Sequence, residues 1–145
     1  MKLHLLFVVA LCVSTQAVPT VEDVRAEVLT KNSISWDGSP VQYPKQGAEI
    51  TVVKISVPDG ARIPLHCHPV PLAAYMLKGA IEVTTSSGEK RIFREGEAFI
   101  EVMNKWHQGT GVGAETELVV FYAGQKNAPL SVNKSSADPL PAGCN

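Results

Sequence analysis

The chain has 145 residues and a formal net charge of −1, and 45% of its residues are hydrophobic while 19% are charged. This length and composition are typical of one globular domain that builds its own core. The 13 basic and 14 acidic residues form no basic stripe along the chain, so nucleic acid is excluded as an expected partner.

The first residues have the pattern of an export signal. Lys2 precedes an apolar run over residues 5–13, and small and polar residues then lead to Ala17. This order is typical of a secretory signal peptide, and the run is much shorter than the roughly 20 residues of a membrane span. A buried core strand is the alternative interpretation. We expect a signal peptide over residues 1–17 and an exported mature protein of 128 residues, periplasmic or extracellular and not held in a membrane.

The rest of the chain predicts an all-β domain over residues 18–124. Short extended runs alternate with turn residues and no long helical period occurs, which is typical of a sandwich or barrel. The expected strands are residues 24–30, 49–57, 65–68, 73–77, 80–85, 90–93, 98–102 and 117–123. Residues 86–89 predict a hairpin turn and residues 109–113 another turn. The polar tail over residues 125–145 has three prolines, and we expect it to lie loosely on the surface.

Two cysteines, Cys67 and Cys144, remain after removal of the signal peptide. An oxidising compartment permits a disulfide between them. The sequence leaves open whether they are bridged or are two free thiols.

The histidines of the mature chain are His66, His68 and His107. Side chains alternate along a strand, so the spacing of His66 and His68 places both imidazoles on one face. His107 lies far enough along the chain to reach the same point from another strand. Imidazole suits zinc, copper, iron and nickel, whereas calcium and magnesium prefer oxygen ligands. An isolated pair of histidines is more often a pair of ordinary residues, but the surrounding sequence favours a metal site.

That surrounding sequence resembles the first motif of the cupin family. The motif has a glycine, five residues, His-x-His, three or four residues, a glutamate, six residues and a glycine. The chain keeps this spacing from Gly60 through the two histidines and Leu72 to Gly79. All of these motif residues match except Leu72, which occupies the position of the glutamate.

The second motif is also present in its spacing. Gly96 is followed by Val102, Met103 and Asn104 in place of the family's Pro-x-Gly, and then by His107. The family's asparagine is replaced by Gly111. The resemblance covers about residues 24–123 and implies a single jelly-roll β-barrel, the double-stranded β-helix of cupins.

The resemblance implies that His66, His68 and His107 bind one divalent transition metal, which is iron, copper, manganese, nickel or zinc. Leu72 cannot bind a cation, so three neutral imidazoles leave the ion its full charge, and open positions remain for water or substrate. We therefore expect a small anionic chelating ligand. Similar three-histidine cupins favour a metal-dependent dioxygenase acting on such a substrate, although no catalytic residue is identified. The alternative functions are a non-catalytic module that binds a small ligand or metal, and a structural barrel with unused histidines.

Further residues are candidates near this site. Met76 shares the strand face of Leu72, so it either approaches the metal or fills the core. Glu101, Gln108, Tyr75 and Trp106 lie close to the histidines in sequence and are either supporting partners of an imidazole or ordinary strand and loop residues. Pairing of cupins through edge strands also implies a homodimer.

Overall fold

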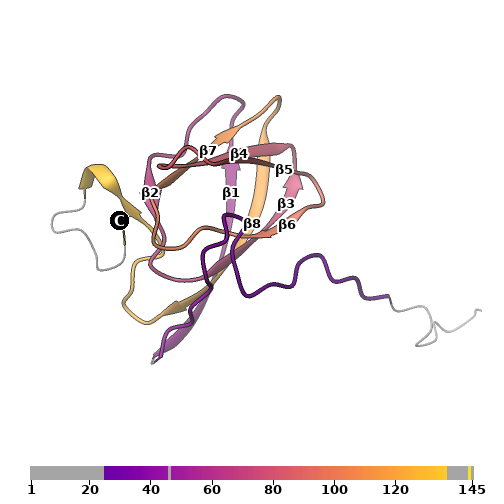
Figure 1. The fold of residues 1–145 in the computed structure, drawn as a ribbon. Coiled ribbons are helices and arrows are strands. Elements are labelled where there is room, and N and C mark those ends of the chain that lie inside the picture. Colours follow the sequence, from indigo (N-terminus) through magenta and orange to yellow (C-terminus); the bar gives the residue numbers. More distant parts are fainter. Residues whose placement is uncertain (1–24, 46, 137–143, 145) are drawn as a thin grey trace, which may run out of the picture.

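The computed structural model describes residues 25–45, 47–136 and 144. Within these residues the fold is all β, apart from one short 3-10 turn, η2 (Lys134–Ser136), and it has the expected class (Figure 1). The strands are β1 (Ala48–Val57), β2 (His66–Cys67), β3 (Leu72–Lys78), β4 (Ala80–Thr85), β5 (Lys90–Arg94), β6 (Ala98–Ile100), β7 (His107–Gly111), β8 (Thr116–Gln125) and β9 (Val132–Asn133). No helix in the described part of the chain is long and apolar enough to cross a membrane.

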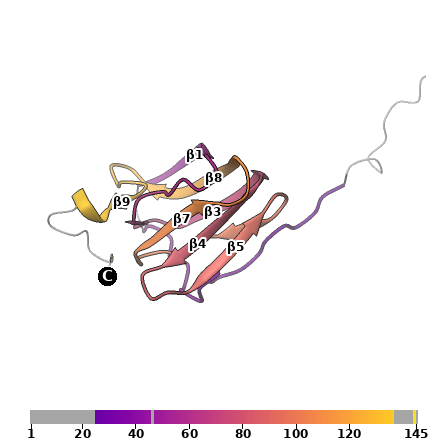
Figure 2. The same ribbon diagram turned by 90° about the horizontal axis from the view of Figure 1, so that it is seen from above.

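Two antiparallel sheets pack face to face. One has the strand order β1-β8-β3-β6 and the other β5-β4-β7-β2-β9. Figure 2 shows the layers from above. The strands β1 and β8 pair in register over their whole length, from Ala48 opposite Gln125 to Val57 opposite Thr116. Because successive side chains point to opposite faces of a sheet, each strand contributes alternate residues to the space between the layers.

The core lies in that space. The inward residues of β3 are Leu72, Ala74 and Met76, all at most 5% exposed. Phe93 and Phe99 stack with ring centroids 3.7 Å apart and join β5 of one sheet to β6 of the other. The other buried members of this core are Val57, Val70, Ile81, Val83, Leu118, Val120 and Tyr122. Burial of each large apolar side chain contributes about 1.5–3 kcal/mol to stability.

Two of the local expectations for strands are wrong. Residues 25–30, expected in an edge strand, form no strand and are exposed, and the segment runs away from the sandwich (Figure 2). Strand preference depends on a partner, and this segment has none among the described residues. The expected turn over residues 109–113 is instead mostly β7, which ends at Gly111.

The turn expected over residues 109–113 does not form because Gly109 and Gly111 allow close packing within β7 instead. A Cβ on Gly111 would lie 2.5 Å from the carbonyl oxygen of Pro58, and one on Gly109 would lie 2.8 Å from Cδ1 of Ile81. Glycine within a strand often marks such a close approach rather than a turn.

The tail does not lie loosely where the structure describes it. Strand β9 pairs with β2, with Asn133 opposite His66 and Val132 opposite Cys67. A disulfide joins Cys67 to Cys144, which is buried with Trp106. The pairing that the sequence left open is therefore present, and it ties the end of the chain to the strand that carries His66. Residues 1–24, the expected signal peptide among them, lie outside the described residues.

Substitution of Gly79, which lies between β3 and β4, tests the close packing at this position. Both Gly79 and Gly88 have positive φ, +72° and +91°, but a Cβ on Gly79 would also lie 2.7 Å from the carbonyl oxygen of Glu115, whereas Gly88 has open space. Gly88→Ala is expected to lower the free energy of unfolding by about 1–2 kcal/mol through backbone strain alone. Gly79→Ala is expected to cost about 1–3 kcal/mol more because the added methyl group meets backbone. Chemical denaturation of both variants measures the difference, and equal losses would contradict the packing argument.

Candidate metal centre

Three histidine side chains meet inside the sandwich where β2 and β7 pair. His66 and His107 are direct cross-strand partners, and His68 follows β2. The ring centroids are 4.8 Å apart for His66 and His68, 4.4 Å for His66 and His107, and 5.0 Å for His68 and His107. The fold thus brings together all three residues that the sequence nominated as ligands.

Each imidazole is oriented by a hydrogen bond to the backbone. Nδ1 lies 2.7 Å from the carbonyl oxygen of Pro64 in His66, 2.7 Å from that of Leu130 in His68, and 2.9 Å from that of Lys105 in His107. A carbonyl oxygen only accepts hydrogen bonds, so Nδ1 carries the proton in all three rings. This tautomer leaves the lone pair on Nε2, the arrangement found in metal-binding histidines.

The loop before β7 contacts two of the three histidines, His68 and His107. Asn104 has φ of 57°, the left-handed conformation that asparagine adopts more readily than most residues. Asn104 occupies the position at which the second motif of the resembling family has glycine. Its backbone N–H donates to the carbonyl oxygen of His68 at 3.0 Å. Lys105, the acceptor for His107, forms an ion pair with Asp37 at 2.6 Å.

The electrostatic environment keeps the histidines neutral. Burial lowers the pKa of His68 to about 3, and the neighbouring charges of His66 and His107 act in the same direction. Burial likewise lowers the pKa of His66, with a further contribution from His107, and it lowers the pKa of His107 against the opposing effect of the hydrogen bond to Lys105. Neutral imidazole is the form that coordinates a metal ion.

The donor set fits a metal ion. One ligand nitrogen from each ring lies within 4.8 Å of the others. The His107 Nε2 atom is fully buried and has no hydrogen-bond partner among the described residues. A buried nitrogen acceptor without a partner is costly, and a cation bound by the three rings would remove that cost. These three nitrogen donors would hold a transition metal rather than calcium or magnesium.

The histidines line a cavity of about 120 Å³ between the sheets. Its walls are mainly aliphatic and aromatic side chains from both sheets, with a few polar groups from the strands and the tail. The lining residues besides the histidines are Ile55, Ile63, Ala74, Ile81, Val83, Phe99, Glu101, Gly109, Leu118, Val120, Tyr122, Ser131 and Asn133. A site with so much apolar wall has a low local dielectric, which strengthens any charge interaction inside it.

The other candidates from the sequence separate into those inside and outside this cavity. Glu101 lines it. Met76 is fully buried in the apolar core and is not among the lining residues, which favours its interpretation as core. Trp106 packs against the disulfide, and Tyr75 is 37% exposed. Gln108 neighbours His107 on β7 and points to the opposite face.

Sequence reasoning missed four residues around the site. Tyr122 lies with its ring centroid 5.7 Å from that of His68, and burial raises the pKa of its hydroxyl to about 12. In the sequence its position in β8 continues the apolar alternation of a core strand. Ser131 and Asn133 come from the tail, where no pattern points to a site. Trp36 donates a hydrogen bond from Nε1 to Glu101 at 3.1 Å across 65 positions of sequence.

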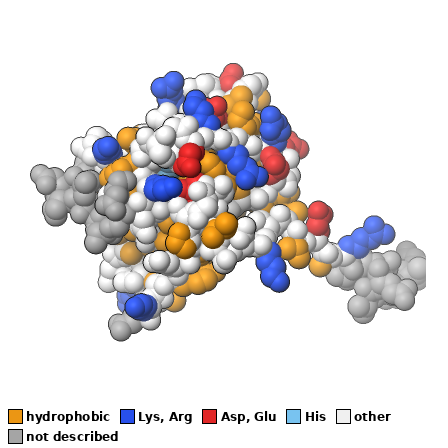
Figure 3. Space-filling model, viewed as in Figure 1, with side chains coloured by type: hydrophobic (Ala, Val, Ile, Leu, Met, Phe, Trp, Pro, Cys, Tyr) orange, Lys and Arg blue, Asp and Glu red, His pale blue; other side chains and the backbone are white. Residues whose placement is uncertain are grey.

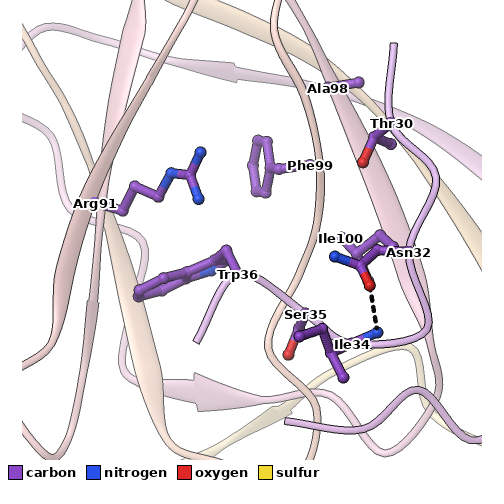
Figure 4. A pocket seen from close by; sticks show the side chains of 9 residues that line it. All are labelled: Thr30, Asn32, Ile34, Ser35, Trp36, Arg91, Ala98, Phe99 and Ile100. Atoms are coloured by element: carbon purple, nitrogen blue, oxygen red, sulfur yellow. Dashed lines mark hydrogen bonds between the residues drawn. The ribbon is translucent and has the colours of Figure 1, made fainter. Parts of the chain in front are cut away.

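A second pocket lies outside the sandwich and contains none of the histidines. It has a volume of about 200 Å³ and lies between the segment around Trp36 and the strands β5 and β6, where Arg91 and Phe99 border it (Figure 4). Acidic and basic side chains are interspersed on the molecular face shown in Figure 3.

Comparison with known proteins agrees with this architecture. Residues 53–123 match the family model of the cupin domain. The DMSP lyase DddQ of Ruegeria pomeroyi DSS-3 is similar at 18% sequence identity with a TM-score of 0.52, over 59% of this chain and 43% of that protein. Oxalate decarboxylase of Bacillus subtilis is similar at 19% identity with a TM-score of 0.53, over 61% of this chain and 25% of that protein.

The chain spans less than half the length of either enzyme, and at these identities the likeness concerns the fold alone. No curated protein matches the sequence significantly. Residues 53–123 are thus similar in sequence to cupin domains, and the described residues have the two-sheet, all-β architecture that the sequence predicted.

Proposed function

We propose that the protein binds one divalent transition metal ion through Nε2 of His66, His68 and His107. One observation carries the proposal: three buried imidazoles converge, and each has its Nδ1 engaged by a backbone carbonyl oxygen. A chance cluster of core histidines would have no reason to bring one ligand nitrogen of each ring within 4.8 Å of the others. Iron, copper, manganese, nickel and zinc are all compatible with this donor set.

The charge of the site favours an anionic ligand at the open coordination positions. Three neutral imidazoles contribute no charge, so the ligand set itself leaves the ion its full charge in a cavity with mainly apolar walls. The volume of about 120 Å³ is below the 300–1,000 Å³ typical of pockets for drug-sized molecules. We therefore infer a small chelating anion, such as a carboxylate, thiolate or enolate.

A catalytic function is the first of two alternatives. A bound metal with open positions would act as a Lewis acid or redox centre for a substrate that chelates it. The chain's own residues would exclude water and orient the substrate, the aliphatic wall by packing and Glu101 and Tyr122 by hydrogen bonds. These features support a dioxygenase-like enzyme. The alternative is a binding module without turnover, which the small, largely apolar cavity also suits.

We further propose that the protein is exported. The signal-like segment over residues 1–17 supports this, and so does the disulfide between Cys67 and Cys144, because such bonds persist in oxidising compartments.

Replacement of the ligands tests the metal site. His66→Ala, His68→Ala and His107→Ala are each expected to weaken metal binding by more than the roughly 10–100-fold that loss of a supporting hydrogen bond costs. Gln108→Ala, beside His107 but on the outer face, is the matched control and should bind as the wild type does. Titration calorimetry with each metal salt measures the affinity. A wild type that binds no transition metal, or histidine variants that bind unchanged, would contradict the proposal.

Small chelating probes separate the enzyme from the binder. Metal-loaded protein is offered oxalate, cysteine and acetylacetone, and binding is followed by calorimetry while oxygen consumption is followed with an electrode. Oxygen uptake with one probe supports the enzyme, and binding without uptake supports the module. Absence of binding by every probe with every metal contradicts the inferred ligand class.

The mass of the secreted protein tests export. Expression of the full chain in a secreting host should yield a product that begins at Val18 and contains no free thiol, because Cys12 is removed and the other two cysteines are bridged. Intact-mass spectrometry with and without thiol alkylation measures both properties. A cytoplasmic product that retains Met1 would contradict the expectation.

A further inference from the structure

A buried carboxylate faces the histidine cavity from the sheet opposite to them. Glu101 follows β6 and is 9% exposed, and its side chain lines the same cavity as the three imidazoles. A carboxylate buried among apolar side chains is costly unless its charge is compensated. Among the described residues no lysine or arginine is paired with Glu101 in an ion pair.

Two hydrogen bonds hold this carboxylate in place. The indole Nε1 of Trp36 donates to Oε1 at 3.1 Å, and the backbone N–H of Val102 donates to the same oxygen at 2.9 Å. Burial raises the pKa of Glu101, whereas the two hydrogen bonds and the interaction with His66 act in the opposite direction. Because the histidines themselves are neutral, a cation held by them would supply the charge compensation that this carboxylate lacks.

We propose that Glu101 is the charge-compensating carboxylate of the metal site, a positioning residue that stabilises a divalent cation held by His66, His68 and His107. The inference rests on the proposed metal site and deepens it. Glu101 is not one of the residues whose ligand atoms lie within 4.8 Å of one another, so it acts on the ion through the cavity rather than as a fourth ligand. The same negative charge disfavours a dianion at the open positions and favours a ligand with a single charge or a proton to share.

Glu101→Gln tests the charge while keeping an oxygen that accepts both hydrogen bonds. We expect metal affinity to fall by about 10–100-fold, as for other outer partners of metal sites, whereas Glu101→Asp, which keeps the negative charge, should retain most of the affinity. Glu95→Gln, a loop residue that is exposed, is the matched control. Calorimetry measures affinity, the visible spectrum of cobalt(II)-loaded protein reports the coordination of the ion, and thermal denaturation without metal reports folding.

A purely structural role for Glu101 predicts a lower melting temperature with unchanged affinity and an unchanged cobalt spectrum, and that result would overturn the inference while leaving the three-histidine site intact. A wild type that binds no metal would overturn the site and the inference together. Should Glu101→Gln not fold, Glu101→Asp and Glu101→Met decide: affinity near the wild-type value for Glu101→Asp and more than tenfold weaker for Glu101→Met supports charge compensation, and equal affinities of the two variants overturn it.

Discussion

Hydrogen bonds between three imidazole Nδ1 groups and three backbone carbonyl oxygens determine what this site can do. The acceptors, Pro64, Leu130 and Lys105, come from three separate segments of the chain. Each bond sets a tautomer and a ring plane, so Nε2 is directed inward before any ion arrives. A site with its ligands already oriented loses less conformational entropy on binding.

Contacts between segments that are distant in sequence place those carbonyl groups beside the histidines. Leu130, which orients His68, belongs to the segment that leads into β9, and β9 pairs with β2. The disulfide from Cys67 to Cys144 holds a further part of the same tail. Cys67 lies between His66 and His68 and faces away from their imidazoles, so its bond restrains the strand without entering the cavity. The end of the chain is therefore part of the site's scaffold.

Much of the fold and the set of candidate ligands could be predicted from the sequence. Alternation placed His66 and His68 on one face, and motif spacing brought in His107 although its strand was taken for a turn. The strand was missed because Gly109 and Gly111 are there for close packing, which a single sequence does not distinguish from turn formation.

The parts that sequence could not predict depend on long-range contacts. The bond from Trp36 to Glu101 and the pairing of β9 with β2 join segments with no shared local pattern. At residues 25–30 the sequence predicted a strand that does not form, because strand preference without a partner strand produces no strand. Metal identity, substrate, export and a homodimer stay predictions.

X-ray absorption at the metal edge of protein purified with its native metal tests the central claim most directly. The account predicts one ion per chain with a scattering shell of three imidazole nitrogens at about 2.0–2.1 Å, the range found for zinc. A shell dominated by sulfur or oxygen, or protein that retains no transition metal, would contradict it.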